Sequence, residues 1–271
     1  MNTCVCGDNR YKSIKNYNTK YGAISIVFCR SCGLARDIKE YDYGFLYTDR
    51  ANIYHPPDNT LFQERILSWE SHLDFLRPYL KADAKILDIG ASDGSFLAFL
   101  QKHGCSGIGV EVNPSMVEFA ISRGLNVIKK PFNEILLTEN SFDLIAMSHI
   151  LEHMPDLGQT IKHALNLLKP GGHLFVIVPN YGCIMMRMFA GVQESLFLPG
   201  QHIWYFTKKS LKSSCALFGL KLVEYETANA SSTGSKIFLG SLIKRLFNFW
   251  MRLTNNGLEI FGLFQKPVEA S

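Results

Sequence analysis

The chain has 271 residues, 47% of them hydrophobic, and a formal net charge of +4 at pH 7. This apolar content supports a folded core and argues against a disordered chain, while the length suits one catalytic domain with a small attachment. The positive charge is spread without a long Lys/Arg block, so nucleic acid is not expected as the main partner.

The N-terminus and the cysteine count give expectations about the compartment. The segment Met1–Cys4 lacks the charged lead and apolar stretch of a signal peptide, and no apolar run reaches the ~20 residues of a membrane-spanning helix. Seven cysteines, four of them near the N-terminus, favour a reducing compartment and a metal site over disulfides. We therefore expect a cytoplasmic protein without a transmembrane segment.

The four N-terminal cysteines form two pairs, Cys4 with Cys6 and Cys29 with Cys32, and a glycine follows each pair. An apolar segment, residues 23–28, lies between the pairs and predicts a strand. Thiolates on two turns joined by strands describe a zinc-ribbon-like lobe, whose structural ion supports a segment too small to bury a core. The first pair has one intervening residue where two are usual, so binding by both of its cysteines stays open. Four reduced cysteines without metal are the alternative.

Three parts follow one another along the chain. The zinc-ribbon-like lobe is expected over residues 1–45, an aromatic linker with a lead-in helix over 46–84, and the main domain over 85–271. The aromatic, turn-rich stretch 41–57 suits a linker or a lid over a substrate, and apolar spacing predicts a helix over 61–80.

The main domain alternates strands and helices, which indicates an α/β fold with parallel strands and helical crossovers. The pattern predicts strands at 85–89, 107–111, 126–128, 142–147, 173–178, 220–226 and 258–265, and helices at 95–103, after Asn113-Pro114, at 158–168, 207–218 and 239–253. The helix 239–253 is basic and amphipathic, which suits a sheet crossover or weak contact with a membrane surface. The apolar stretch 183–199 suits a methionine-lined lid or a helix on the domain surface.

The most informative segment is the glycine-containing turn between the first sheet strand and its helix. Turns of this kind bind nucleoside cofactors beyond the carboxyl ends of parallel strands. A dinucleotide site requires Gly-x-Gly-x-x-Gly, but Ser92 and Ser95 stand at the second and third glycine positions. Asp88 and Asp93 would repel a pyrophosphate and attract a cation. The turn therefore favours S-adenosylmethionine, which is cationic and carries no phosphate, over NAD.

The pattern Asp88-x-Gly90-x-x-x-Gly94, followed by Glu111, resembles the cofactor signature of class I S-adenosylmethionine-dependent methyltransferases. The segments 140–147, 151–156 and 167–180 resemble further motifs of that family in the same order. The resemblance implies a Rossmann-like, doubly wound sheet of seven strands, the last one antiparallel. It also implies a set of cofactor-binding residues, namely Asp88, Gly90, Ala91, Gly94, Glu111, Val112, Phe132, Ser148 and His149.

Within this set, the resemblance places Glu111 at the ribose hydroxyls and Asp88 at an amide or the ammonium of the cofactor. Ser148 and His149 end the fourth strand and are expected to face the cofactor. For Phe132 two roles are equally expected: stacking on the adenine ring or packing in the core.

Methyl transfer needs a base only when the acceptor must lose a proton, and histidine suits that role. His202 lies between the fifth strand and the next helix, where this fold places its acceptor loop, and we predict it as the base. Its alternative is a structural histidine bonded to backbone. Tyr205 is predicted to polarise the acceptor, and His153 either to take part in catalysis or to hold the loop after the fourth strand.

The cysteine lobe together with His202-x-x-Tyr205-Phe206 is similar to sugar C-methyltransferases that act on nucleotide-linked deoxy-keto-sugars. The chain departs from them at Gln201, where they often have glutamate, and it stops after the methyltransferase domain. We expect methylation of a small molecule, with a nucleotide-linked sugar or glycan precursor as the leading candidate. The alternatives are O-methylation of a lipid-like or aromatic acceptor, a non-catalytic zinc-dependent binding module, and an NAD-dependent oxidoreductase.

Overall fold

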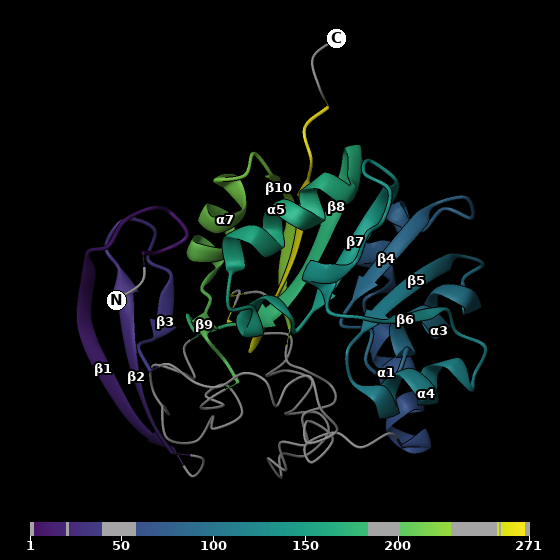
Figure 1. The fold of residues 1–271 in the computed structure, drawn as a ribbon, viewed down its shortest axis with the longest axis horizontal. Helices are drawn as coiled ribbons and strands as arrows, with labels where there is room; N and C mark the ends of the chain where they lie inside the picture. Colours follow the sequence, from purple (N-terminus) through teal and green to yellow (C-terminus); the bar gives the residue numbers. More distant parts are fainter. Residues whose placement is uncertain are drawn as a thin grey trace. The chain divides into compact units, whose positions relative to one another are not determined.

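The computed structural model describes residues 3–19, 22–39, 58–183, 201–228, 254 and 256–268 (Figure 1). The stretch 41–57, the helix 239–253 and nearly all of the apolar stretch 183–199 therefore lie outside the described residues. Contacts divide the chain into a first unit, Met1–Tyr41 with His149–Ile161 and Val176–Phe264, and a second unit, Asp42–Ser148 with Lys162–Phe175 and Gln265–Ser271. No helix in the described ranges is long and apolar enough to cross a membrane.

A four-stranded sheet in the first unit carries the four N-terminal cysteines. Cys4 and Cys6 precede its first strand, Cys29 ends its second strand, and Cys32 follows that strand. Its order is β1 (Tyr11–Thr19), β2 (Gly22–Cys29), β3 (Ala35–Asp37) and β9 (Trp204–Tyr205), and neighbouring strands are antiparallel. Only β2 was predicted, because polar residues interrupt the apolar alternation of β1 and because β9 joins from a distant part of the chain. Ala35 pairs with Tyr205, so the segment after His202 is fixed to this sheet.

The predicted seven-stranded α/β sheet is confirmed, with the order β10-β11-β8-β7-β4-β5-β6 (Figure 1). Its strands are β4 (Lys85–Ile89), β5 (Ser106–Glu111), β6 (Val127–Lys129), β7 (Phe142–Ser148), β8 (Leu168–Pro179), β10 (Lys221–Ala228) and β11 (Glu259–Gln265). Strand β4 pairs in parallel with β5 and β7, and β5 with β6. Backbone bonds join Gly171 to Lys266 and Asn180 to Leu258, so β11 runs antiparallel to β8, as expected.

Helices connect these strands: α1 (Asn59–Glu70), α2 (Leu73–Leu76), η3 (Arg77–Tyr79), α3 (Ser95–Lys102), α4 (Pro114–Ile121), η4 (Phe132–Glu134), η5 (Leu151–His153), α5 (Leu157–Leu167) and α7 (Lys208–Ala216). The prediction of one continuous helix over 61–80 is wrong, because Ser71 ends α1 with backbone bonds to Ser68 and Trp69. The predicted caps are confirmed, since Asn113 accepts from Met116 and Thr207 forms a capping box with Ser210.

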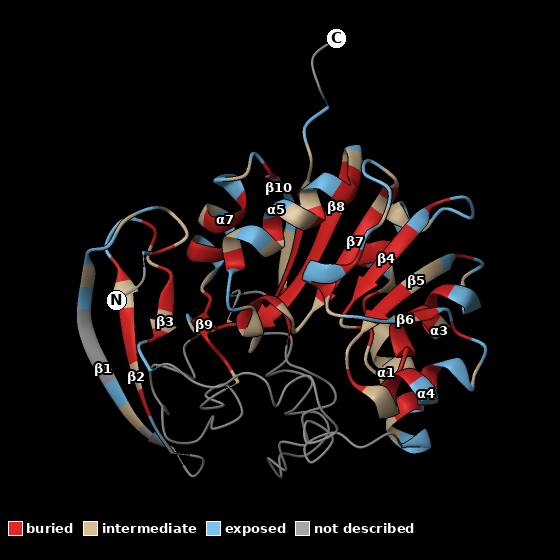
Figure 2. Cartoon of the chain, in the orientation of Figure 1, coloured by how far each residue is buried: buried red, intermediate tan, exposed pale blue. Residues whose placement is uncertain are grey.

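Strands β4 and β7 are almost wholly buried, as are the carboxyl-terminal residues of β8 (Figure 2). Parallel strands that are covered on both faces have continuous apolar sequences. The buried residues Ile86, Leu87 and Ile89 form such a sequence, and β4 was therefore predicted correctly. Because Ile89 of β4 pairs with Val110 of β5, the two strands bring their carboxyl ends together. The turn after β4 and the last residue of β5 therefore form one edge of the sheet.

Gly109 of β5 offers a stability test of this edge. A Cβ at this position would lie 2.7 Å from Ala91 Cβ and 2.9 Å from Leu97 Cδ1. We expect Gly109→Ala to lower the free energy of unfolding by about 1–3 kcal/mol, measured by urea denaturation. Gly158→Ala is the control, because its Cβ would meet only ordinary contacts at 3.6 Å and alanine favours helix. Equal stability of the two variants would contradict the close approach at Gly109.

Candidate functional site

The turn after β4 is tied to the end of β5 by its backbone. The amides of Gly90 and Ala91 donate to the Val110 carbonyl at 2.8 and 3.0 Å. The amide of Ser92 donates to Glu111 Oε2 at 2.8 Å, and Ser92 has a positive φ of 49°. Such backbone in a non-glycine residue is uncommon and persists only where surrounding contacts hold it.

Gly94 must be glycine for two reasons. Its φ is 80°, which disfavours a side chain, and a Cβ there would lie 2.5 Å from Leu125 Cδ1. The start of α3 therefore packs closely against Leu125, in the connection between α4 and β6. The sequence therefore predicted this glycine for a turn, and the structure adds a steric reason.

Three carboxyl groups lie at this edge of the second unit: Asp88, Asp93 and Glu111. The Asp88 side chain is buried, and this burial, followed by the charges of Glu111 and Asp93, raises its pKa from 3.8 to about 8. Asp93 is also buried but has a partner, since Arg65 Nη1 lies 2.6 Å from its Oδ2. Sequence reasoning missed Arg65, because nothing in α1 indicates which carboxylate it meets. Asp88 is thus poised to ionise when a cation approaches, which favours the charged form of an acid.

The Glu111 carboxylate is oriented by backbone amides. Its Oε1 accepts from the amides of Val112 and Asn113 at 2.7 and 2.8 Å, in addition to the Ser92 bond to Oε2. An ionised carboxylate has about four acceptor sites, so capacity for hydroxyl donors is left after these three bonds. Glu111 lies at the end of β5, and its contact with the ribose stays a prediction.

The remaining predicted cofactor residues are placed as follows. Phe132 is buried in η4, and its ring meets the His163 ring edge-on with centroids 4.6 Å apart. This environment fits the core alternative and leaves adenine stacking a prediction. Ser148 ends β7, and His149 follows it with a φ of 55° and an amide that donates to the Ile177 carbonyl at 2.9 Å.

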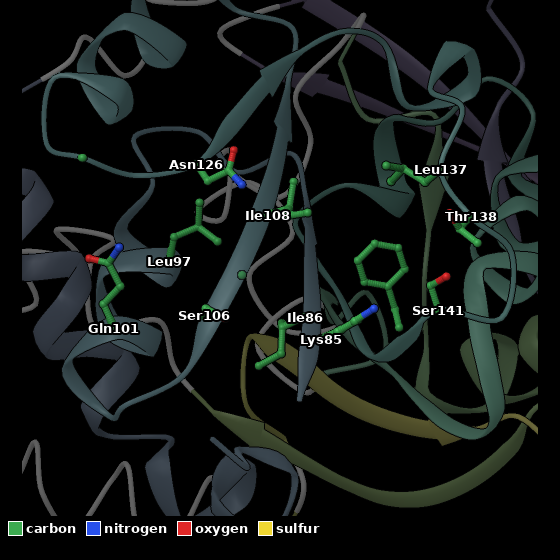
Figure 3. A pocket seen from close by; sticks show the side chains of 13 residues that line it. Lys85, Ile86, Leu97, Gln101, Ser106, Ile108, Asn126, Leu137, Thr138 and Ser141 are labelled. Atoms are coloured by element: carbon green, nitrogen blue, oxygen red, sulfur yellow. The ribbon is translucent and has the colours of Figure 1, made fainter. Parts of the chain in front are cut away.

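A cavity of about 460 Å³ lies at the opposite end of the strands (Figure 3). Lys85, Ser106 and Phe142, which begin β4, β5 and β7, line it. Ligands of open α/β sheets bind beyond the carboxyl ends of the strands. The cavity is therefore separate from the predicted cofactor residues on the turn after β4.

A second group of candidate functional side chains lies in the first unit, where two loops are joined by hydrogen bonds. The Ile203 amide donates to the Glu152 carbonyl at 2.7 Å, and Trp204 Nε1 donates to the Met154 carbonyl at 2.7 Å. His153 Nδ1 lies 2.9 Å from the Gln201 carbonyl oxygen. These bonds bring the predicted catalytic residues His153 and His202 together, with ring centroids 4.8 Å apart.

Tyr205 has a different environment from the one expected of a polarising group. Its ring is buried in a cluster with Ile24, Ile26, Ala35 and Cys183. Its hydroxyl donates to the His202 carbonyl at 3.3 Å. Tyr205 therefore holds the backbone of His202, and its predicted action on an acceptor stays a prediction.

Glu152 is the fully buried carboxylate among these histidines, and sequence reasoning missed it as a site residue. His149 Nδ1 lies 3.3 Å from Glu152 Oε1, and His149 Nε2 lies 3.1 Å from Glu259 Oε1. Burial lowers the pKa of His149, but the two carboxylates outweigh it and raise this pKa to about 10. The signal for Glu152 was its place between Leu151 and His153. Glu259 gave no signal, because β11 meets His149 only in the folded chain.

The four N-terminal cysteines meet in the fold. Cys4 Sγ lies 3.5 Å from Cys32 Sγ, Cys6 Sγ lies 3.4 Å from Cys29 Sγ, and all four sulfurs are within 4.8 Å of one another. Gly7 and Gly33 have φ values of 81° and 73° and donate to the carbonyls of Cys4 and Cys29, which closes both turns. A tetrahedral ion with Zn–S bonds of about 2.3 Å requires sulfurs about 3.8 Å apart. The donor set and its spacing fit zinc.

The raised pKa of Asp88 has a consequence for stability. Between its ordinary value of 3.8 and about 8, the folded chain holds a proton here that the unfolded chain releases, so stability falls as pH rises through this window. We expect the melting temperature of the wild type to fall more than that of Asp88→Asn between about pH 5 and about pH 8. Parallel curves for the two proteins, followed by circular dichroism, would contradict the assignment.

A model of the methyltransferase domain matches residues 62–225. Over 101 residues the chain is 34% identical to a ubiquinone biosynthesis O-methyltransferase of Coxiella burnetii, covering 35% of this chain and 43% of that protein. A protein of the same name from Saccharophagus degradans is 32% identical over 106 residues, covering 36% and 45%. The chain thus spans less than half the length of these curated relatives.

Solved structures agree on the fold. A SAM dependent methyltransferase from Archaeoglobus fulgidus superposes with a TM-score of 0.56 at 21% identity, covering 74% of this chain and 94% of that one. The complex of the Haloferax volcanii Trm112 methyltransferase activator with a methyltransferase gives 0.56 at 15% identity, covering 79% and 97%. Such identities show the fold alone.

Because the domain model matches more than half of its residues, the chain belongs to the methyltransferase-domain family, among the class I S-adenosylmethionine-dependent methyltransferases.

Proposed function

We propose that the chain transfers a methyl group from S-adenosylmethionine to a small-molecule acceptor. The observation that carries the proposal is the carboxyl edge of β4 and β5, where buried Asp88 and the amide-bound Glu111 flank a turn without a dinucleotide glycine pattern. The cofactor supplies an electrophilic methyl group on a sulfonium. Asp88 would hold its ammonium or an amide, Glu111 its ribose hydroxyls, and the backbone from Gly90 to Gly94 its methionine portion.

The acceptor must lose a proton if it is a hydroxyl or an acidic carbon, and we infer that the histidine group of the first unit serves this step. His202 is the proposed base, since it is buried beside His153 and its backbone is held by Tyr205. Glu152 lies close enough to stabilise a positive charge on these histidines.

Two acceptor classes are supported by different observations. The names of the curated relatives favour O-methylation, with a lipid-like or aromatic hydroxyl as acceptor. The cysteine lobe and the His202-x-x-Tyr205-Phe206 segment favour a nucleotide-linked sugar or glycan precursor. We propose O-methylation first, because a measured sequence relationship supports it. A non-catalytic module is disfavoured by the intact Asp88 and Glu111.

Cofactor binding can be tested by thermal shift. S-adenosylhomocysteine is expected to raise the melting temperature of the wild type, and Glu111→Ala to weaken its binding at least about tenfold, since a charge-assisted bond contributes about 1.5–3 kcal/mol. Glu118→Ala, an exposed change on α4, is the control and should bind normally. Stabilisation by NADH in place of S-adenosylhomocysteine would overturn the proposed cofactor.

The acceptor can be tested by mass spectrometry of reactions with phenolic acceptors and nucleotide-linked sugars. With the true acceptor, His202→Gln should lower kcat by about 10²–10⁴-fold, the usual contribution of a general base, and leave S-adenosylhomocysteine affinity unchanged. His173→Gln, a histidine of β8 in the second unit, is the control. Unchanged kcat in His202→Gln would exclude it as the base.

We also propose that Cys4, Cys6, Cys29 and Cys32 bind one structural zinc ion, on the support of their sulfur geometry. Purified protein should then contain zinc by elemental analysis, and Cys29→Ser should lose it and melt at a lower temperature. Cys215→Ser, a buried cysteine of α7, is the matched control and should keep the metal. Zinc-free wild type prepared without a chelator would contradict this proposal.

A further inference from the structure

Glu152, His153 and His202, here called the carboxylate–histidine cluster, have the composition of a second metal site. All three belong to the first unit, and their ligand atoms lie within 4.8 Å of one another. Glu152 Oε1 is 3.9 Å from His153 Nε2. Small side-chain movements would bring these atoms to the separations that a shared ion with bonds of about 2.0–2.2 Å requires.

The Glu152 carboxylate is the strongest reason to expect a ligand. The residue has no exposed surface, and neither of its oxygens has a hydrogen-bond partner among the described residues. His149 Nδ1 approaches Oε1 at 3.3 Å, but that contact is an ion pair without hydrogen-bond alignment, and the same ring also meets Glu259. A buried carboxylate without hydrogen bonds is costly, and such groups are commonly paired or coordinate metals.

His153 is oriented as metal-binding histidines usually are. Its Nδ1 lies 2.9 Å from the Gln201 carbonyl oxygen. A carbonyl oxygen can only accept a hydrogen bond, so Nδ1 carries the hydrogen. The lone pair is then on Nε2, the atom nearest Glu152. Ligating histidines typically donate their second ring nitrogen to a carbonyl or carboxylate in this way.

His202 completes the set from a separate loop. Its side chain is buried at 5% exposure and its ring meets that of His153 edge-on. Its position is fixed on both sides, because Tyr205 donates to its carbonyl and the next residue, Ile203, is bonded to the backbone of Glu152. The fold thus holds the two histidines and the carboxylate in place without any ion.

We propose that the carboxylate–histidine cluster binds a divalent transition-metal cation such as Co²⁺, Fe²⁺ or Zn²⁺. Two imidazoles and one carboxylate suit these ions and leave coordination positions for oxygen atoms of a ligand. The role of the ion rests on the proposed function: it would lower the pKa of the acceptor hydroxyl that it binds. In the metal-bound protein His202 would therefore act on the acceptor through the ion that it binds, and this role replaces the direct proton removal given to it under the proposed function.

Metal titration of the 271-residue chain separates this proposal from the others. Chelator-treated protein is titrated with Co²⁺, and bound metal is followed by equilibrium dialysis and absorption. Thiolate ligands give an intense charge-transfer band, whereas oxygen and imidazole ligands do not. The wild type is expected to bind two Co²⁺ per chain, one at the four cysteines with the thiolate band and one at the carboxylate–histidine cluster without it, whereas Cys29→Ser should keep the band-free ion.

Glu152→Gln and His202→Gln should weaken binding of this ion at least about tenfold, while His173→Gln should bind it as the wild type does. Each variant is first checked for stabilisation by S-adenosylhomocysteine, which reports a folded cofactor unit and tests the proposed function separately. Binding of Co²⁺ only with the thiolate band would overturn the second site. The second site would also be overturned if Glu152→Gln bound the Co²⁺ ion that gives no thiolate band with unchanged affinity.

Discussion

The bonding of the turn after β4 to the end of β5 is the constraint on which the cofactor edge depends. Ser92 keeps a left-handed backbone because its amide donates to Glu111, and Glu111 in turn is held by the amides of Val112 and Asn113. One carboxylate therefore shapes the turn and the start of α4 together. The same arrangement buries Asp88 beside two other acids, a cost that a bound cation would relieve.

Much of the fold could be predicted from the sequence, because the buried parallel strands are continuous apolar runs with glycine turns after them. Strand β4 begins and ends where the pattern placed it, and Asn113 and Thr207 cap the predicted helices. The break of the lead-in helix after Glu70 could not be predicted from apolar spacing, which continues through the break.

The candidate sites were predicted unevenly, for a physical reason. Residues that act through local backbone, such as Gly90 and Gly94, stand in a short pattern that the sequence displays directly. Arg65 and Glu259 matter through partners far away in the chain, and no spacing rule reaches them. The pairing of β3 with β9 is of the same kind, since it depends on a two-residue strand.

That short pairing links the backbone of the two proposed metal sites of the first unit. Trp204 and Tyr205 are an edge of the cysteine-bearing sheet, and they directly follow the loop that carries His202. A change in the conformation of the cysteine turns would therefore be transmitted through the pairing of β3 with β9 to His202, which lies two residues before β9. The small N-terminal sheet thus fixes the backbone that follows His202, and if His202 is the proposed functional residue, damage to this sheet should lower turnover before the chain unfolds.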